Sequence, residues 1–134
     1  YHVIAGGQHL QKTYSTRFGG VKVEALSDVS FTVEQGEYLA IMAAGAGKTT
    51  LLNILAALDR PTGGSVCLNG RDITKISDRE LSASAGIIWL VFQDFNLLDT
   101  FSLKDNIFLP LVLAGTPYRE MSLRLGPIAR QLGI

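Results

Sequence analysis

One short segment constrains the fold of this chain more than any other, namely Gly45-Ala46-Gly47-Lys48-Thr49-Thr50. It follows a continuous apolar run at residues 38–42, which is typical of a strand buried on both faces. It leads into residues 48–58, where leucines recur at helical spacing and no glycine or proline occurs, which predicts a helix. A buried strand, a glycine-rich loop and a helix in this order predict a phosphate-binding loop.

Each residue type in this loop suits the binding of phosphate groups. Glycines let backbone N–H groups turn toward phosphate oxygens, and the helix N-terminus adds a partial positive charge. Lys48 is predicted to reach the β- and γ-phosphates and Thr49 to place its hydroxyl on Mg²⁺. The alternative is a glycine-rich turn with a solvated lysine. The residues predicted to hold the nucleotide phosphates are Gly45, Ala46, Gly47, Lys48, Thr49 and, as a weaker candidate, Thr50.

The loop departs from the usual pattern Gly-x-x-x-x-Gly-Lys-Ser/Thr in one place. The first glycine of that pattern falls at Met42, so the loop is one residue short. We expect a shorter loop to curl less completely around the β-phosphate, which weakens binding. Such a loop occurs in GTPases, kinases and transport ATPases, so residues outside the loop are needed to distinguish these classes of protein.

The rest of the chain indicates a mixed α/β domain. Val29, Phe31 and Val33 alternate with polar residues and predict a half-buried strand over 28–33, which a turn at 34–37 joins to 38–42 as a hairpin. The first eleven residues show only weak periodicity. Further expected elements are a strand at 65–68 before the Asn69-Gly70 turn, a short helix at the Ser77-x-x-Glu80 capping box, a strand at 86–92, a helix from Ser102 toward Pro110, and a helical segment over 119–132 interrupted at Gly126-Pro127.

Several stretches outside the loop resemble one known family. They are Lys12-Thr13-Tyr14, Glu24-Ala25-Leu26, Val29-Ser30-Phe31, Gly36-Glu37-Tyr38, 48–55, 58–64, 91–100 and 106–111. Together they resemble the ATP-binding subunit of an ABC transporter, from about Gln11 to Ile134. Within that family the chain is most similar to the lipoprotein-release and macrolide-export group, and Asn-Leu-Leu-Asp-Thr at 96–100 points toward its bacitracin and antimicrobial-peptide resistance branch.

The resemblance implies roles for two further residues. Tyr14 matches the aromatic residue that stacks on adenine, and an aromatic face suits a nucleobase; an ordinary core or surface tyrosine is the alternative. Gln93 matches the glutamine of the Q-loop, whose amide oxygen ligates Mg²⁺ or orients water; a solvated glutamine at a strand end is the alternative. Lys48 and Gln93 are therefore the candidate catalytic residues, and Thr49 and Gln93 the candidate metal ligands.

The segment from Gln93 to Phe101 is implied to contact a membrane permease subunit. Its apolar side chains would suit a helix that docks in a groove, although some of them could instead pack in the core. These side chains are Phe95, Leu97, Leu98 and Phe101.

The resemblance also implies a fold, the α/β P-loop NTPase core of an ABC ATPase with an antiparallel β subdomain at its N-terminal side and the C-terminal half missing. We expect an antiparallel β region over 1–37, the P-loop core up to the Q-loop over 38–93, and the start of a helical subdomain over 94–134. Residues 81–90 depart from the family, because they carry no charge and look one residue short.

Three features that the family needs for hydrolysis do not occur in the sequence. They are the Leu-Ser-Gly-Gly-Gln signature contributed by a second copy of the subunit, an apolar strand that ends in Asp-Glu, and a switch histidine.

The expected function is the ATP-binding subunit of a bacterial ABC transporter, which couples ATP and Mg²⁺ binding and hydrolysis to export or sensing of peptides, lipids or drugs. The 134 residues alone are expected to be inactive. The alternatives are a nucleotide- or permease-binding fragment without turnover and a small kinase, against which the neutral composition and the context of Gln93 argue.

Composition argues against two other classes of protein. Twelve basic and 12 acidic residues give a net charge of zero, which disfavours a nucleic-acid binder. The longest uncharged runs, 81–93 and 106–118, fall short of the roughly 20 apolar residues of a membrane-spanning helix, and no signal-peptide pattern is present. The chain begins at Tyr1, not Met, so we expect a preceding segment to be missing. We expect a cytoplasmic protein held at the inner face of the membrane by its permease.

Overall fold

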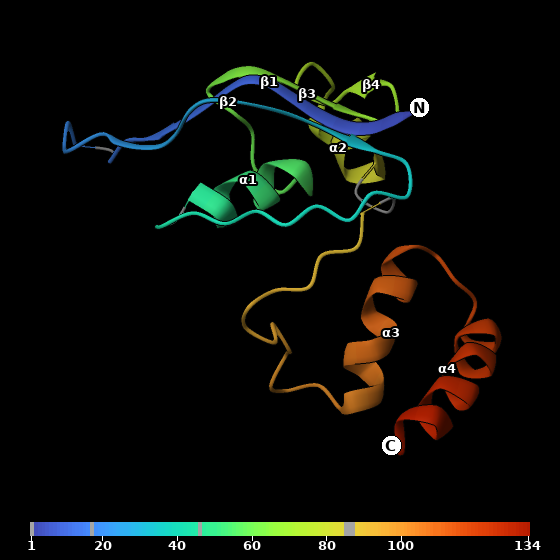
Figure 1. Cartoon of the computed structure of the whole chain (residues 1–134). Helices are drawn as coiled ribbons and strands as arrows, with labels where there is room; N and C mark the ends of the chain where they lie inside the picture. The colour runs from blue at the N-terminus through green and yellow to red at the C-terminus, as the bar shows by residue number, and fades with distance from the viewer. Residues whose placement is uncertain (1, 17, 46, 85–87) are drawn as a thin grey trace. The chain divides into compact units, whose positions relative to one another are not determined.

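A four-stranded antiparallel sheet organises the first part of the chain. The computed structural model describes residues 2–16, 18–45, 47–84 and 88–134. The sheet has the order β2-β1-β3-β4, and each neighbouring pair is antiparallel. Figure 1 shows two helices, α1 and α2, on the same side of this sheet. The bounds of these elements are β1 Val3–Tyr14, β2 Val23–Glu34, α1 Gly47–Leu55, β3 Gly63–Leu68, β4 Arg71–Asp72 and α2 Asp78–Ser84.

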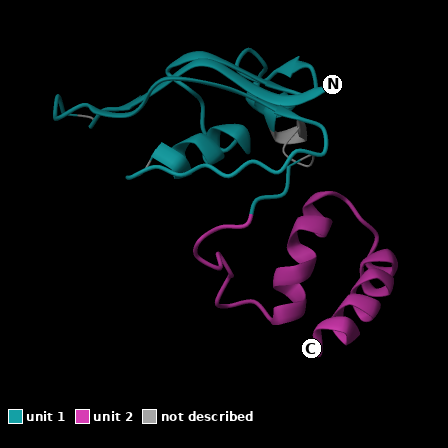
Figure 2. Ribbon diagram, viewed as in Figure 1, with its two compact units in different colours: residues 1–90 teal, residues 91–134 magenta. Residues whose placement is uncertain are grey.

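The chain divides into two compact units, residues 1–90 and 91–134 (Figure 2). The sheet, α1 and α2 make up the first unit. The second holds α3 (Leu103–Leu113) and α4 (Tyr118–Leu132), where the Phe108 and Tyr118 rings meet edge to face with centroids 5.9 Å apart. Among the helices in the described ranges, none is long and apolar enough to cross a membrane.

An apolar core joins the sheet to the helices of the first unit. Leu10 of β1, Ile54 of α1 and Val66 of β3 are almost completely buried. Burying one such side chain stabilises the fold by about 1.5–3 kcal/mol. The packing therefore holds α1 against the sheet and sets where its N-terminus lies. The other core residues are Leu26, Leu51, Ile73 and Leu81.

Strand β1 is an element that the weak periodicity of its sequence did not indicate. His9 has a φ of 49° and Asp28, on the neighbouring strand, a φ of 57°, and the register shifts between Gly7 and Leu10. A bulge of this kind resets the alternation of side chains. The buried positions Gly7 and Leu10 are consequently three residues apart, which hides the period of two.

Two predicted strands are wrong. Residues 38–42 pair with no described strand, and Tyr38 and Met42 are 95% and 91% exposed. The hairpin between 28–33 and 38–42 does not form, because β2 takes β1 as its partner along its length. Residues 88–92 are likewise not in a strand, while 86 and 87 lie outside the described residues. A strand buried on both faces needs neighbouring strands and cover on each face, and the described residues supply these to neither run.

The predicted helices form, with one correction at the end of α1 and one in the interior of α4. Helix α1 ends at Leu55, not at 58, because Ala57 takes a left-handed φ of 61°. The N–H groups of Ala57 and Leu58 then donate to the carbonyl oxygens of Ile54 and Asn53, which is a Schellman motif. Helix α4 runs through Gly126-Pro127, so the predicted interruption is wrong. An interior proline removes its own N–H bond and crowds the carbonyl four residues before it, yet the helix continues past Pro127 to a C-cap at Gly133.

The remaining local signals are confirmed. Ser77 and Glu80 form the predicted capping box, in which the N–H of Ser77 donates to a Glu80 carboxylate oxygen at 3.1 Å and the N–H of Glu80 donates to the Ser77 hydroxyl at 3.4 Å. Ser102 caps α3 through the N–H of Asp105. Asn69-Gly70 has positive φ at both residues and joins β3 to β4, as a type I′ turn requires.

Replacement of Gly64 by alanine is expected to destabilise the sheet strongly. Gly64 has a φ of 81°, and a Cβ there would lie 2.3 Å from the carbonyl oxygen of His9. Gly70 has a similar φ of 76° but open space around it. We expect Gly64→Ala to lower the free energy of unfolding by about 3 kcal/mol, from backbone strain plus the clash. Gly70→Ala should lower it by about 1 kcal/mol, from strain alone. Urea unfolding measures both, and equal losses would contradict the clash.

Candidate functional site

The glycine-rich loop leads directly into α1, as the sequence predicts. Gly45 has a φ of 84°, a left-handed conformation that glycine adopts without penalty. A Cβ on Gly47 would lie 3.1 Å from the carbonyl oxygen of Ala25 in β2. Glycine at this position therefore lets the N-terminus of α1 approach the sheet closely. Ala46 lies outside the described residues.

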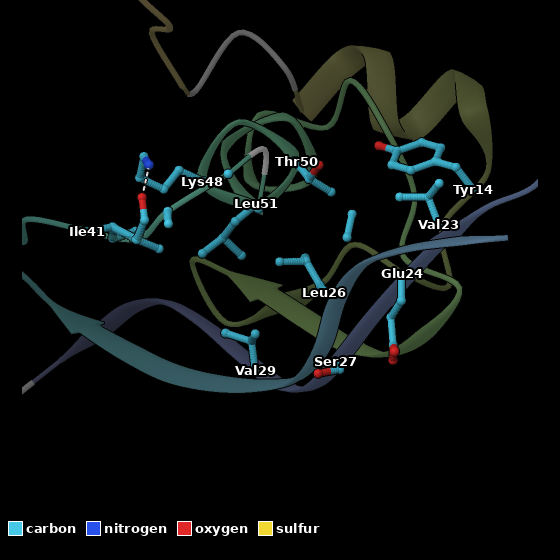
Figure 3. Close-up of a pocket in the computed structure, with 15 residues that line it drawn as sticks. Tyr14, Val23, Glu24, Leu26, Ser27, Val29, Ile41, Lys48, Thr50 and Leu51 are labelled. Atoms are coloured by element: carbon cyan, nitrogen blue, oxygen red, sulfur yellow. Dashed lines mark hydrogen bonds between the residues drawn. The ribbon is translucent and has the colours of Figure 1, made fainter. Parts of the chain in front are cut away.

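A hollow of about 610 Å³ lies beside the loop and the first turns of α1. Residues of three segments line it: the end of β1, the first half of β2, and the chain from residue 41 through the start of α1. Five of the predicted site residues, Tyr14, Gly45, Gly47, Lys48 and Thr50, are among them. Figure 3 shows Lys48 and Tyr14 on opposite sides of the hollow, with Thr50 between them.

Lys48 lies close to the loop that precedes it. Its Nζ donates a hydrogen bond to the carbonyl oxygen of Ala43, drawn as a dashed line in Figure 3. An ammonium group has three donors, so this bond leaves others for an anion. Thr49 is exposed at the first turn of α1, whereas Thr50 is only 5% exposed and lines the hollow. The first turn of α1 thus offers a cation, an exposed hydroxyl and backbone N–H groups in one place.

Two side chains hold Tyr14, one at its hydroxyl and one over a face of its ring. Its hydroxyl donates to Oδ2 of Asp59 at 2.9 Å, and Nζ of Lys12 lies 5.0 Å from the ring centroid. The same Nζ donates to Oδ1 of Asp59 at 2.8 Å and to the carbonyl oxygen of Arg60 at 2.6 Å. Lys12-Thr13-Tyr14 and 58–64 both stood out in the sequence, but nothing in the pattern indicated that they meet.

The Asp59 carboxylate is stabilised in its charged form. Partial burial alone would raise its pKa, but hydrogen bonds from Lys12, from the Tyr14 hydroxyl and from the backbone N–H of Arg60 outweigh this. The pKa of Asp59 therefore lies below its ordinary value of 3.8. The carboxylate keeps its charge and its acceptor role at neutral pH.

Gln93 belongs to the second unit, residues 91–134. It is exposed and lies in a bend outside the helices and strands. The apolar side chains that follow it are also exposed, as the sequence indicated. Their exposed fractions are 91% for Phe95, 57% for Leu97, 43% for Leu98 and 45% for Phe101.

Asn106, in α3, bonds to the end of this segment, a part that its sequence pattern did not indicate. Its Oδ1 accepts the N–H of Leu98 at 2.8 Å, and its Nδ2 donates to the carbonyl oxygens of Leu98, Phe101 and Ser102 at 3.0–3.3 Å. The amide of Asn106 therefore fixes the turn from 98 to 102 against the start of α3. The available signals were its place four residues after the capping Ser102 and at the start of the family-like stretch 106–111.

Comparison with known structures identifies the kind of fold. The dimeric post-hydrolysis structure of the ATP-binding cassette MJ0796, bound to ADP and Pi, aligns with a TM-score of 0.78 at 31% identity. The alignment covers 90% of this chain and 53% of that one. The antiparallel sheet with its helices is thus the N-terminal part of an ABC ATPase.

Sequence comparison gives the same answer. A sequence model of the ABC transporter family matches residues 26–134, and the chain belongs to this family. It is 44% identical to the uncharacterised ABC transporter ATP-binding protein YvcR of Bacillus subtilis, over 94% of this chain and 49% of YvcR. It is 37% identical to the bacitracin export ATP-binding protein BceA of Halalkalibacterium halodurans, over 98% of this chain and 52% of BceA. The chain spans about half the length of these relatives.

The lowered pKa of Asp59 predicts a loss of stability in acid. An unfolded carboxyl group takes up its proton at a higher pH than the folded one, so stability falls as the pH drops below about 4 through the lowered pKa. We expect Asp59→Asn, which cannot ionise, to reduce this fall. The measurement is urea unfolding at pH 5 and at pH 3 for both proteins. An unchanged pH dependence in the variant would contradict the stabilisation of the charged carboxylate.

Proposed function

We propose that this chain is part of the ATP-binding subunit of a bacterial ABC transporter and that ATP binds in the hollow beside Gly45–Thr50. The observation that carries the proposal is the convergence of Tyr14, Lys48 and Thr50 on one hollow at the N-terminus of α1. The family match and the ADP and Pi bound to MJ0796 support it.

The residues around the hollow fit the chemistry of a nucleoside triphosphate. The helix N-terminus and the Lys48 ammonium are donors for phosphate oxygens, and the absence of a Cβ on Gly47 lets the backbone approach closely. Tyr14 supplies an aromatic face at the opposite side, about the place where a base would lie. Thr49 has an exposed hydroxyl, a hard oxygen donor of the kind that Mg²⁺ prefers. Gln93, in the second unit, is by the family resemblance the other candidate Mg²⁺ ligand, through its amide oxygen. When bound, Mg²⁺ neutralises charge on the phosphates.

Coupling to a membrane permease forms the second part of the proposal. The exposed apolar residues between Phe95 and Phe101 are the proposed contact, because such a surface suits a docked helix. A second copy of the subunit is the proposed partner in hydrolysis, as the dimer of MJ0796 suggests. The subunit would then work in the cytoplasm at the inner face of the membrane.

Among transported substrates, we favour peptides over lipids and other drugs. The support is the name of one relative, the bacitracin export protein BceA at 37% identity, together with Asn-Leu-Leu-Asp-Thr at 96–100. ATP binding and hydrolysis would drive export or sensing of such a peptide by way of the permease.

Loss of the Lys48 ammonium is expected to weaken ATP binding at least tenfold. A hydrogen bond to a charged group contributes about 1.5–3 kcal/mol, and 1.4 kcal/mol corresponds to tenfold. Isothermal titration calorimetry of the 134-residue polypeptide with Mg-ATP measures the effect of Lys48→Ala. Lys75→Ala is the matched control, because Lys75 is exposed, does not line the hollow and pairs loosely with Asp72 at 3.7 Å. Equal weakening by both variants, or no binding by the unaltered chain, would overturn the proposal.

Binding without turnover is the second candidate for these 134 residues taken as a polypeptide. Lys48 supplies part of the charge neutralisation that phosphoryl transfer needs, but the sequence holds neither the Asp-Glu strand nor the signature. We therefore expect the polypeptide to bind ATP and to release no phosphate at a steady rate. A phosphate-release assay at saturating Mg-ATP tests this. A steady rate that Lys48→Ala abolishes would show the expectation to be wrong.

A further inference from the structure

The carboxylate of Asp59 accepts three hydrogen bonds, two from residues at the end of β1 and one from the next residue in the chain. Its Oδ1 accepts from Nζ of Lys12 and from the backbone N–H of Arg60, both at 2.8 Å. Its Oδ2 accepts from the hydroxyl of Tyr14 at 2.9 Å. Both oxygens therefore accept hydrogen bonds, which fixes the orientation of the carboxylate. Because Oδ2 accepts from the Tyr14 hydroxyl, the carboxylate in turn restrains the Tyr14 ring.

Lys12 fixes the same ring from one face. Its Nζ lies 5.0 Å from the Tyr14 centroid, within the range of a cation–π interaction. The Lys12 side chain is only 12% exposed and does not line the hollow, whereas Tyr14 is 42% exposed and lines it. One face of the ring is thus covered by the lysine, and the other is left for a ligand in the hollow.

The Asp59 group is also tied to the helix that carries Lys48. The N–H of Asp59 donates to the carbonyl oxygen of Asn53 in α1 at 3.3 Å. The guanidinium of Arg60 donates to the carbonyl oxygen of Ile76 at 2.9 Å and to Asp78 at 2.7 Å. These bonds place the 59–60 segment between α1 and the chain that enters α2, so the ring is held in a set relation to α1.

We propose that Asp59 is a positioning residue for adenine recognition and that it acts, together with Lys12, by holding the Tyr14 ring at the edge of the hollow. The inference rests on the proposed function, since it takes the ligand to be ATP. Tyr14 is the last residue of β1 and is partly exposed, so its ring would otherwise sample several rotamers. Ordering a side chain on binding weakens affinity by about three- to tenfold, and a ring that is already held avoids this loss.

The test compares two ligands that differ in the base. Isothermal titration calorimetry with Mg-ATP and with magnesium tripolyphosphate, which has the phosphates but no adenosine, is run on the 134-residue chain. We expect Tyr14→Phe, which keeps the ring but loses the hydroxyl, and Asp59→Ala each to weaken ATP binding by about three- to tenfold and to leave tripolyphosphate binding unchanged. Because both substitutions break the same Tyr14–Asp59 hydrogen bond, the double variant should lose no more ATP affinity than either single variant. Asp59→Asn keeps an acceptor oxygen and should restore most of the ATP affinity.

A control variant and thermal melts separate a loss of ring positioning from a loss of folding. The melts show whether each variant is folded. Asp78→Asn alters an exposed carboxylate bound to the same arginine but not to Tyr14, and it should change neither affinity. If Asp59→Ala fails to fold, Tyr14→Phe alone must show the selective loss of ATP affinity. Equal loss of both ligands, or additive losses in the double variant, would overturn the positioning role and leave the proposed function standing. If the unaltered chain binds neither ligand, both proposals fall.

Discussion

The packing of α1 onto the antiparallel sheet is the constraint on which the rest of the first unit depends. Ile54 and Leu51 of the helix lie in one apolar cluster with Leu10, Leu26 and Val66 of the sheet. This contact sets the direction of the helix and brings its N-terminus to β2, where the missing Cβ of Gly47 permits a close approach. The hollow exists because the helix end, the loop and the edge strand β2 are held together in this way. The phosphate-binding chemistry proposed here is thus a consequence of apolar burial.

A second set of interactions is polar and fixes the side of the hollow opposite Lys48, where Tyr14 lies. Asp59 joins the end of β1 to the segment after α1, and its charge is stabilised by Lys12, Tyr14 and the N–H of Arg60. Apolar packing would instead cover the Tyr14 ring, which is partly exposed and is proposed to contact a ligand. Apolar contacts position α1, and directed hydrogen bonds position the ring.

Two apolar runs show how far a local pattern can mislead. Residues 38–42 have the composition of a strand buried on both faces, yet Tyr38 and Met42 are exposed and no described strand pairs with the run. Residues 88–92 behave in the same way. The composition of a segment indicates the surroundings that suit it. Whether it pairs as a strand depends on which other strands lie next to it in the fold. Here β1 satisfies the hydrogen bonds of β2, although its own sequence signal was obscured by the bulge at His9.

The sequence by itself determined the elements whose cause is local. These include the glycine loop before α1, the capping box at Ser77, the cap at Ser102 and the Asn69-Gly70 turn, because each depends on the residue types within a few positions. It also carried enough of the family pattern to indicate an ABC ATPase. Only the tertiary structure decided that Tyr14 bonds to Asp59, that β1 pairs with both β2 and β3, and that Tyr14 and Lys48 line one hollow. These are contacts between residues far apart in the chain, and no local spacing encodes them; they follow from how the sheet and α1 bury their apolar faces together.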